Sequence, residues 1–247
     1  MSAVMTGGIS SATLHLIAMG AMLLDHIWAV GLVSSDVLTC IGRIAFPIFA
    51  FLLAEGFRRT KNRKRYAMRL FLFALISEVP FDLMVSGGVF YPFHQNIYWT
   101  LLLGFGAMAL NEKAARTEKG ILRIVTAVLT ATCTYILGFV LFVDYYGVGV
   151  MMVLAFYFFN EDDFLHRLGQ FAALYYLNVE MLGGLVYPFE FFGREVLIPQ
   201  QALALLALPI IWLYQGRQGY HSRAFQYFRY AFYPAHILIL YLIAAFL

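Results

Sequence analysis

The chain has 247 residues, of which 62% are hydrophobic and only 13% are charged, and its formal net charge is +3. A water-soluble domain carries about 25% charged residues, so this composition excludes an ordinary soluble globular protein. The mean hydropathy of +0.76 indicates that lipid surrounds most outer side chains, and the small net charge gives no reason to expect a nucleic-acid partner.

A helix that crosses a bilayer needs about 20 mainly apolar residues, and the sequence predicts about nine such spans in one domain that covers residues 1–247. We expect the spans near residues 11–33, 36–56, 66–86, 96–111, 120–142, 147–160, 165–184, 197–215 and 228–247. The sixth is short, which indicates a tilted helix or a half-span. The first contains His15, Asp25 and His26 and lacks the clean apolar core of a cleavable signal peptide, so we expect none. The predicted fold is an all-α, polytopic transmembrane helix bundle.

Basic residues in the short loops predict the orientation of the bundle. The run 58–65 joins the second and third spans and holds six lysines or arginines, which is typical of a cytoplasmic loop. The other basic loops carry Lys113, Arg116 and Lys119, then Arg167, then Arg217, Arg223 and Arg229. They are every second loop, so we expect a cytoplasmic N-terminus and, with nine spans, a C-terminus on the outside.

Ionisable side chains gather at one predicted depth, towards the non-cytoplasmic half of the bilayer. Such groups cost several kcal/mol inside a membrane and call for a partner or a function. The residues at this depth come from five consecutive spans and their edges: Asp25, His26, Arg43, Glu78, Asp82, His94, Gln95, Asn96, Asp144 and Tyr145. Random scatter would not place them at one level.

Two interpretations of this layer stay open from the residues alone. In the first, Arg43 neutralises Asp25, Glu78 or Asp82 in ion pairs that lock the bundle. In the second, the layer lines a reaction chamber, and a carboxylate orients the imidazole of His26 and raises its basicity. Neighbouring helical residues point about 100° apart, so the carboxylate of Glu78 or Asp82 is as good a candidate as that of Asp25.

The inner side has candidate ligand-binding residues of its own. Arg58, Arg59 and Lys61 fit plain cytoplasmic anchoring, and they equally fit a phosphate-rich ligand. His15 and His236 are expected deeper in the membrane from that side, and Pro234 frees a carbonyl that can accept a bond or meet a ligand. The cysteines, Cys40 and Cys133, are too few and too far apart to indicate a disulfide framework or a metal site.

The motifs then show a resemblance to a known family. The chain resembles the TraX family in Asp25-His26-Ile27, 43–51, 55–57, 60–62, Tyr66, 74–83, Gln95-Asn96, 101–104, Asp144-Tyr145, Gly149, Ala202-Leu203, 214–216 and 232–236. The resemblance covers nearly the whole chain. It implies a bacterial inner-membrane protein related to membrane acyltransferases, the namesake of the family being an acetylase of the pilin N-terminus.

The resemblance also implies roles for the residues named above. Acetyl-CoA or a longer acyl-CoA would be the donor, held near His15, Arg58, Arg59, Lys61 and His236, and no metal is implied. His26 would be the general base, and Asp25, Glu78 or Asp82 would orient it or bind an acceptor ammonium. Arg43, or Gln95 and Asn96, would stabilise the oxyanion. The residues implied in acceptor binding are Gln95, Asn96, Asp144 and Tyr145. Many relatives in the wider superfamily have Lys or Arg where this chain has His15.

Several alternatives stay open at this point. The acceptor could be a pilin terminus, another peptide, a glycan or a small molecule, and transfer could be direct or pass through an acyl-histidine. Buried carboxylates, a histidine and proline-broken helices also fit a proton-coupled transporter. A third hypothesis is a non-catalytic assembly partner of a pilus or secretion system.

Overall fold

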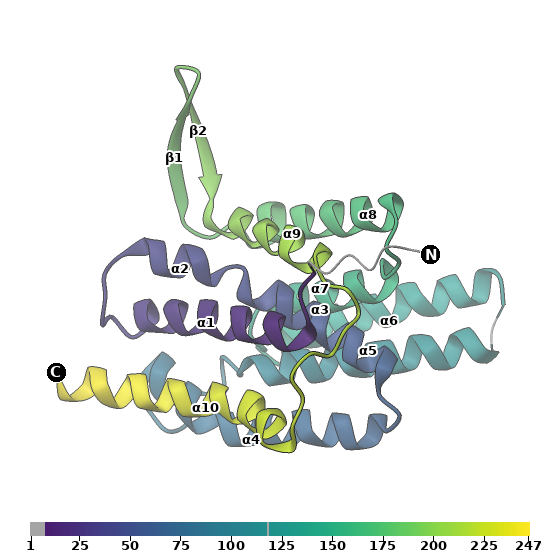
Figure 1. Cartoon of the computed structure of the whole chain (residues 1–247), viewed down its shortest axis with the longest axis horizontal. Helices are drawn as coiled ribbons and strands as arrows, with labels where there is room; N and C mark the ends of the chain where they lie inside the picture. The colour runs from purple at the N-terminus through teal and green to yellow at the C-terminus, as the bar shows by residue number, and fades with distance from the viewer. Residues whose placement is uncertain (1–7, 118) are drawn as a thin grey trace.

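The structure is a computed structural model, and it describes residues 8–117 and 119–247. Its elements, drawn in Figure 1, are α1 (Ser11–Ala29), α2 (Asp36–Gly42), α3 (Ala45–Arg59), α4 (Arg63–Ser86), α5 (Ile97–Thr117), α6 (Ile121–Val140), α7 (Tyr146–Phe158), α8 (Phe164–Tyr175), the π-helix η1 (Tyr176–Leu182), β1 (Val186–Phe191), β2 (Arg194–Pro199), the 3₁₀-helix η2 (Gln200–Leu206), α9 (Ala207–Trp212) and α10 (Arg223–Phe246). The protein is therefore mostly helical, as predicted.

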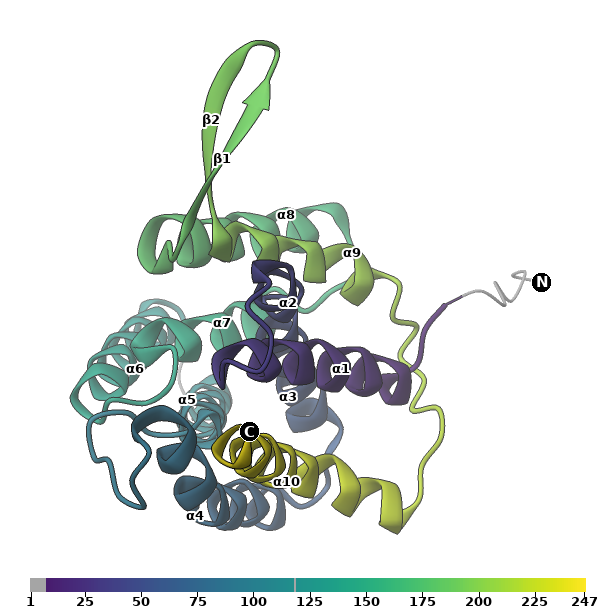
Figure 2. The same ribbon diagram turned by 90° about the vertical axis from the view of Figure 1, so that its left-hand side faces the viewer.

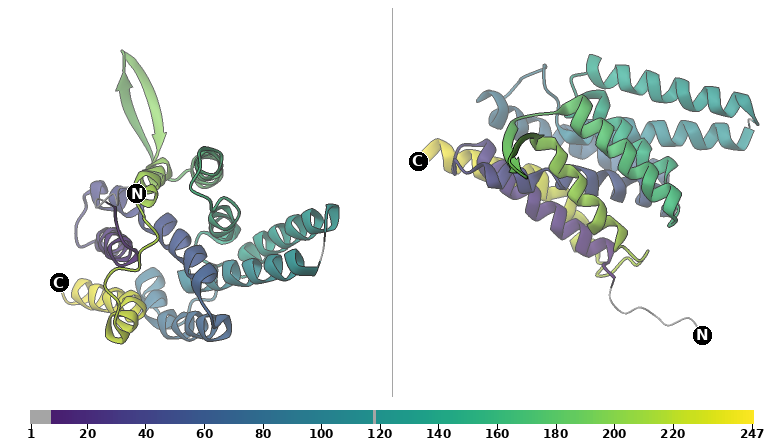
Figure 3. Two further views of the ribbon diagram at one scale, coloured as in Figure 1. Left: turned by 45° about the vertical axis from the view of Figure 1, so that its right-hand side comes forward. Right: turned by 90° about the horizontal axis from the view of Figure 1, so that it is seen from above.

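Helices α3 and α7 form the centre of the bundle. Most residues of α3 between Ala45 and Phe57, and of α7 between Gly147 and Phe156, are buried. Figure 2 shows the other helices arranged around this pair. In contrast, α6 leaves large apolar side chains exposed along its length, and Figure 3 shows α5 and α6 running side by side away from the rest of the bundle. An exposed apolar helix of 20 residues matches the thickness of a bilayer core.

Each predicted span coincides with one helix or with two helices in series. Among the described residues, four helical stretches are long and apolar enough to cross a membrane: Ser11–Ala29, Asp36–Arg59, Ile121–Val140 and Arg223–Phe246. The figure of nine crossings and the orientation of the termini stay predictions. Figure 1 shows the end of α3, the start of α4 and the end of α5, which carry most of the basic residues of the first two basic loops, at the same end of the bundle.

Local chemistry explains where the helices begin and bend. Ser10 caps α1 by accepting from the amide of Thr13, and Asn62 caps α4 by accepting from Arg65. Inside α10, Pro234 has no amide hydrogen to give the carbonyl of Tyr230. That carbonyl accepts from the hydroxyl of Tyr98 at 2.9 Å instead, which confirms that the carbonyl freed by Pro234 takes a new partner.

The prediction of an all-α fold was wrong in one region. Residues 186–199 form an antiparallel hairpin, with Val186 paired to Pro199 and Phe191 to Arg194. Phe192 and Gly193 form its two-residue turn, both with positive φ, as the turns of tight hairpins require. The strands are rich in aromatic and β-branched residues that favour extended backbone. Figure 1 shows the hairpin projecting from the bundle.

Candidate functional site

Two cavities inside the bundle have a common wall. The larger has a volume of about 600 Å³ and is lined mainly by α1, α3, α4 and α10 and the segment before α10. The smaller, of about 90 Å³, is lined by residues that include His26, Asp25, Tyr145 and Tyr233. Phe49, Tyr98, Leu101 and Arg229 line both cavities. A ligand in the larger cavity therefore lies next to the chamber that holds His26.

His26 makes a close contact with His236 of α10. The Nδ1 atom of His26 lies 2.6 Å from the Nε2 atom of His236, and the rings stack with centroids 4.9 Å apart. The Nδ1 atom of His236 lies 2.6 Å from the carbonyl oxygen of Phe232. A carbonyl only accepts, so this nitrogen carries the hydrogen. When both rings are neutral, His236 accepts from Nδ1 of His26, and the lone pair of His26 is left on Nε2.

This chain of hydrogen bonds makes His236 a positioning residue, and that can be tested. If His26 is the general base that the family resemblance implies, His236→Leu should lower kcat for acyl transfer by about 10²-fold, because His26 loses the partner that fixes its tautomer. The KM for the acyl donor should stay unchanged. His236→Gln keeps an acceptor for Nδ1 of His26 and should recover part of kcat. Steady-state kinetics on the three proteins checks this, and an equal loss in both variants would contradict it.

The carboxylate of Asp25 points to Arg43 and not to His26. The Nη2 atom of Arg43 lies 2.5 Å from Oδ1 of Asp25, and the hydroxyl of Thr39 donates to the same oxygen at 2.6 Å. Gln200 of η2 then donates to Thr39 at 3.2 Å. A side chain at Gly42 would meet Asp25, so glycine lets α2 approach α1 this closely. The Arg43–Asp25 pair matches the ion-pair interpretation of these two residues.

Glu78, Asp82 and Asn96 are absent from the described lining of both cavities. The side-chain amide of Asn96 donates to Glu78 and to the carbonyl of Ala74, and the indole of Trp99 donates to Glu78 at 2.8 Å. Asp82 accepts from the amide of Tyr91 at 2.9 Å. These contacts hold α4 against the segment that leads into α5. They therefore give Glu78, Asp82 and Asn96 a structural role.

The segment after α6 carries Asp144 and Tyr145 into the smaller cavity. Its backbone pairs with Gln95, whose carbonyl accepts from the amide of Asp144 at 2.9 Å. Phe142, Tyr145 and Tyr146 all have positive φ. This backbone conformation is unfavourable for aromatic residues, and residues that adopt it are often found at functional sites. Tyr145 stacks on Phe46, and glycine at position 149 leaves room for this, because a side chain there would meet the Cβ atom of Tyr145 and the ring of Phe46.

At the edge of this segment, His94 lies 3.4 Å from the carboxylate of Asp144. The hydrogen bond to Asp144 raises the pKa of the His94 imidazole above its usual value, against the opposing effect of partial burial. The imidazole is therefore favoured in its charged form beside Asp144. This pair was not predicted as a unit, although both residues belong to the polar layer.

The larger cavity is strongly basic. Its described lining residues include His15, Arg59, Arg69, His221 and Arg229, with Glu55 as the one carboxylate among them. Glu55 is already bound: Oε1 lies 2.5 Å from Nε of Arg59, and Oε2 lies 3.0 Å from Nη2 of Arg58. The cavity is therefore suited to an anionic ligand.

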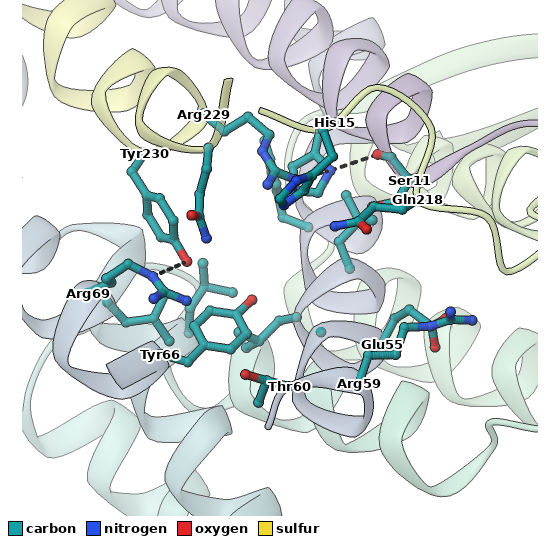
Figure 4. A pocket seen from close by; sticks show the side chains of 18 of the residues that line it. Ser11, His15, Glu55, Arg59, Thr60, Tyr66, Arg69, Gln218, Arg229 and Tyr230 are labelled. Atoms are coloured by element: carbon teal, nitrogen blue, oxygen red, sulfur yellow. Dashed lines mark hydrogen bonds and ion pairs between the residues drawn. The ribbon is translucent and has the colours of Figure 1, made fainter. Parts of the chain in front are cut away.

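Arg229 occupies a central place in this lining. Its Nη1 atom lies 3.0 Å from Nε2 of His15, whose Nδ1 atom lies 2.7 Å from the carbonyl of Ser11. The Nε atom of Arg229 is buried and has no partner in the residues that the structure describes. Figure 4 shows Arg229 beside His15 and Arg69 joined to Tyr230. α10 thus supplies a fixed positive charge where the resemblance implies Lys or Arg at position 15.

The predicted donor-binding residues divide between cavity and surface. His15 and Arg59 line the larger cavity, whereas Lys61 is exposed and outside its lining. Arg58 lines a separate cavity and donates to the carbonyl of Phe156, and His236 contacts His26. Sequence reasoning did not predict Arg69 and Arg229 as residues of the larger cavity. The sequence did contain a signal for them: Arg69 lies inside a predicted span and Arg229 lies at the edge of another. Each is near a tyrosine that lines the same cavity.

Comparison with known proteins identifies the family of the chain. The family model for "TraX protein" matches residues 10–244. "Probable fimbrial assembly protein FimC, serogroup H1" of Dichelobacter nodosus is 29% identical over an alignment 248 positions long, which covers 94% of this chain and 94% of the relative. No solved structure matches the chain. The match to the family model spans nearly every element of the fold and both cavities, and the chain belongs to the TraX family.

Proposed function

We propose that the protein is an acyltransferase of the bacterial inner membrane, which moves an acetyl group from acetyl-CoA to an amine or hydroxyl acceptor. The observation that carries this proposal is the common wall of the two cavities. A basic cavity of about 600 Å³ adjoins a chamber of about 90 Å³ that holds a histidine with its lone pair on Nε2. The larger volume is in the range of pockets for cofactor-sized molecules.

The donor fits this pair of cavities by charge and by size. The phosphates of CoA would meet Arg59, Arg69 and Arg229, whose guanidinium groups suit phosphate oxygens. The thioester would then lie at the common wall, beside Tyr98 and Leu101. The small volume of the inner chamber favours an acetyl group over a long acyl chain.

The proposed reaction follows from the free nitrogen of His26. Its Nε2 atom takes a proton from the acceptor amine or hydroxyl, which attacks the thioester carbonyl. The carbon–sulfur bond then breaks, and the CoA sulfur leaves with the proton returned by His26. The products are the acetylated acceptor and free CoA. The hydroxyls of Tyr145 and Tyr233 line the same chamber and can donate to the developing oxyanion.

Binding of acetyl-CoA to detergent-purified protein tests the donor site. We expect Arg69→Gln and Arg229→Gln each to weaken binding about 10-fold or more, since each removes a charged hydrogen bond worth about 1.5–3 kcal/mol. Lys61→Gln removes the same charge from the exposed basic run, outside the cavity, and should leave the affinity unchanged. Isothermal titration calorimetry on the four proteins measures this.

The outcome separates the cavity from general electrostatic attraction. Equal weakening in Lys61→Gln and the two arginine variants would point to the basic loop and not to the cavity. Absence of binding by folded protein, for acetyl-CoA and for longer acyl-CoAs, would overturn the proposal. Movement of a solute across liposomes without any acyl-CoA would then support a transporter.

The relative's name directs the search for the acceptor. A fimbrial assembly protein covers 94% of this chain, so we propose a pilus-related role and a subunit N-terminal amine as the first acceptor to try. A peptide with the N-terminal sequence of a pilus subunit is incubated with acetyl-CoA and the protein, and mass spectrometry of the peptide detects the added acetyl group. A pilus defect in a strain that lacks the protein, without any change in subunit mass, would favour a non-catalytic assembly partner.

A further inference from the structure

A third cavity, of about 420 Å³, lies away from the two cavities described above. It is bounded by the ends of α3, α4 and α7 and by parts of α5 and α6, and its described lining consists of Phe57, Arg58, Arg63, Asn111, Glu112, Arg123, Ala127, Tyr157, Phe158 and Asn160. None of these residues lines the acetyl-CoA cavity. The third cavity therefore has no part in the proposed reaction.

The charges around this cavity are unequal. Three guanidinium groups, those of Arg58, Arg63 and Arg123, meet a single carboxylate, that of Glu112. Arg63 bonds Glu112 through Nη2 at 2.5 Å and its guanidinium lies 4.2 Å above the ring of Phe57. A site with this excess of positive charge favours an anion.

Two of the three arginines have capacity left to bind a ligand. The Nε atom of Arg63 is buried and has no partner within 8–117 and 119–247. Arg123 is exposed at the start of α6. Arg58 is occupied, because it donates to Glu55 and to the carbonyl of Phe156. Arg63 and Arg123 are thus the groups that can hold an anion.

The surroundings point to a lipid. Beyond Arg123, α6 exposes large apolar side chains over much of its circumference. They are Ile124, Val125, Val128, Leu129, Ile136 and Leu137. Such a surface on a 20-residue helix suits acyl chains. The cavity also lies at the helix ends that carry the basic loops, which are predicted to be cytoplasmic, and anionic lipids are bound by basic pockets between helices on that side.

We propose that Arg63 and Arg123 bind the phosphate of an anionic phospholipid headgroup, whose acyl chains lie along the exposed face of α6. The group that the site would recognise is a phosphate that is covalently attached to acyl chains. A free inorganic phosphate has the same charge but gains nothing from α6. The site is independent of acetyl-CoA and of the acceptor.

Native mass spectrometry of the detergent-purified protein, titrated with lipid, tests the proposal. We expect phosphatidylglycerol to bind more tightly than phosphatidylcholine. Arg63→Gln/Arg123→Gln should weaken phosphatidylglycerol binding by about 10-fold, in keeping with the contribution of each basic residue near an anionic lipid. Lys113→Gln/Lys119→Gln is the matched control, because it also removes two charges, both from exposed positions outside the cavity lining. It should bind phosphatidylglycerol as the unaltered protein does.

Each other outcome overturns the proposal. Equal binding of the two lipids would show that the headgroup charge is not recognised. Displacement of phosphatidylglycerol by inorganic phosphate alone would identify a soluble-anion site. Equal effects in the arginine and lysine variants would show that only overall charge matters. If the double arginine variant does not fold, Arg123→Gln alone tests the same point, because Arg123 is exposed and forms no ion pair in the described chain.

Discussion

His26→Gln should lower kcat for acetyl transfer by about 10²–10⁴-fold, the range that a positioned general base contributes. The variant keeps a polar side chain that can still meet His236 but has no basic nitrogen. Binding of acetyl-CoA should persist, because the cations proposed to hold its phosphates lie in the larger cavity. Product is measured by mass spectrometry and donor binding by calorimetry, on the same preparations.

The control for this prediction is His166→Gln. His166 lies at the start of α8, bonded to Asp163 and outside both cavities, so its loss should leave transfer unchanged. If His26→Gln keeps full activity while it folds and binds the donor, His26 is not the base. If it loses activity and donor binding together, its role lies in binding.

Arg43→Gln should lower the free energy of unfolding by about 3–5 kcal/mol, the cost of leaving one member of a buried ion pair without its partner. The side chains of Arg43 and Asp25 are only 14% and 19% exposed, so little water reaches them. Thr39 still donates to the carboxylate but supplies no charge. Thermal unfolding in detergent, followed by circular dichroism, measures the change.

The double variant Asp25→Asn/Arg43→Gln separates the two interpretations of this pair. Removing both charges should recover much of the stability, because no unpaired charge is left. If acetyl transfer recovers with it, the pair is structural. If stability returns and kcat stays low, Arg43 or Asp25 also acts on the reacting groups. Destabilisation as large as that of the single variant would contradict the ion-pair account.

The helices could be predicted from the sequence because long apolar runs are separated by clear turn signals. The hairpin could not, since its two strands expose apolar side chains on both sides and lack the alternation that marks a half-buried strand. The gathering of Asp25, His26 and Asp144 was predicted by depth alone. Depth does not say which way a helix is rotated about its axis, and so it left Glu78 and Asp82 among the candidates for the cavity.

The place of His236 shows the effect of a helix boundary. Sequence reasoning began the last span at residue 228 and expected His236 nearer the inner side, as a donor-binding residue. In the structure α10 begins at Arg223, five residues earlier. At about 1.5 Å per residue, the extra length places His236 farther from the start of its helix than the predicted span did, and there it contacts His26. Arg229 was read as a loop residue for the same reason and became a cavity residue once its helix was extended.

The pairing of α1 with α10 has a consequence for the biosynthesis of the protein. His26 and Arg229 line the chamber together, yet one is supplied near the beginning of the described chain and the other near its end. A nascent chain that ends before α10 contains the central pair α3 and α7. It lacks both the His26–His236 contact and the His15–Arg229 contact. Both contacts form only when α10 packs beside α1, so the two cavities are completed by the last described helix.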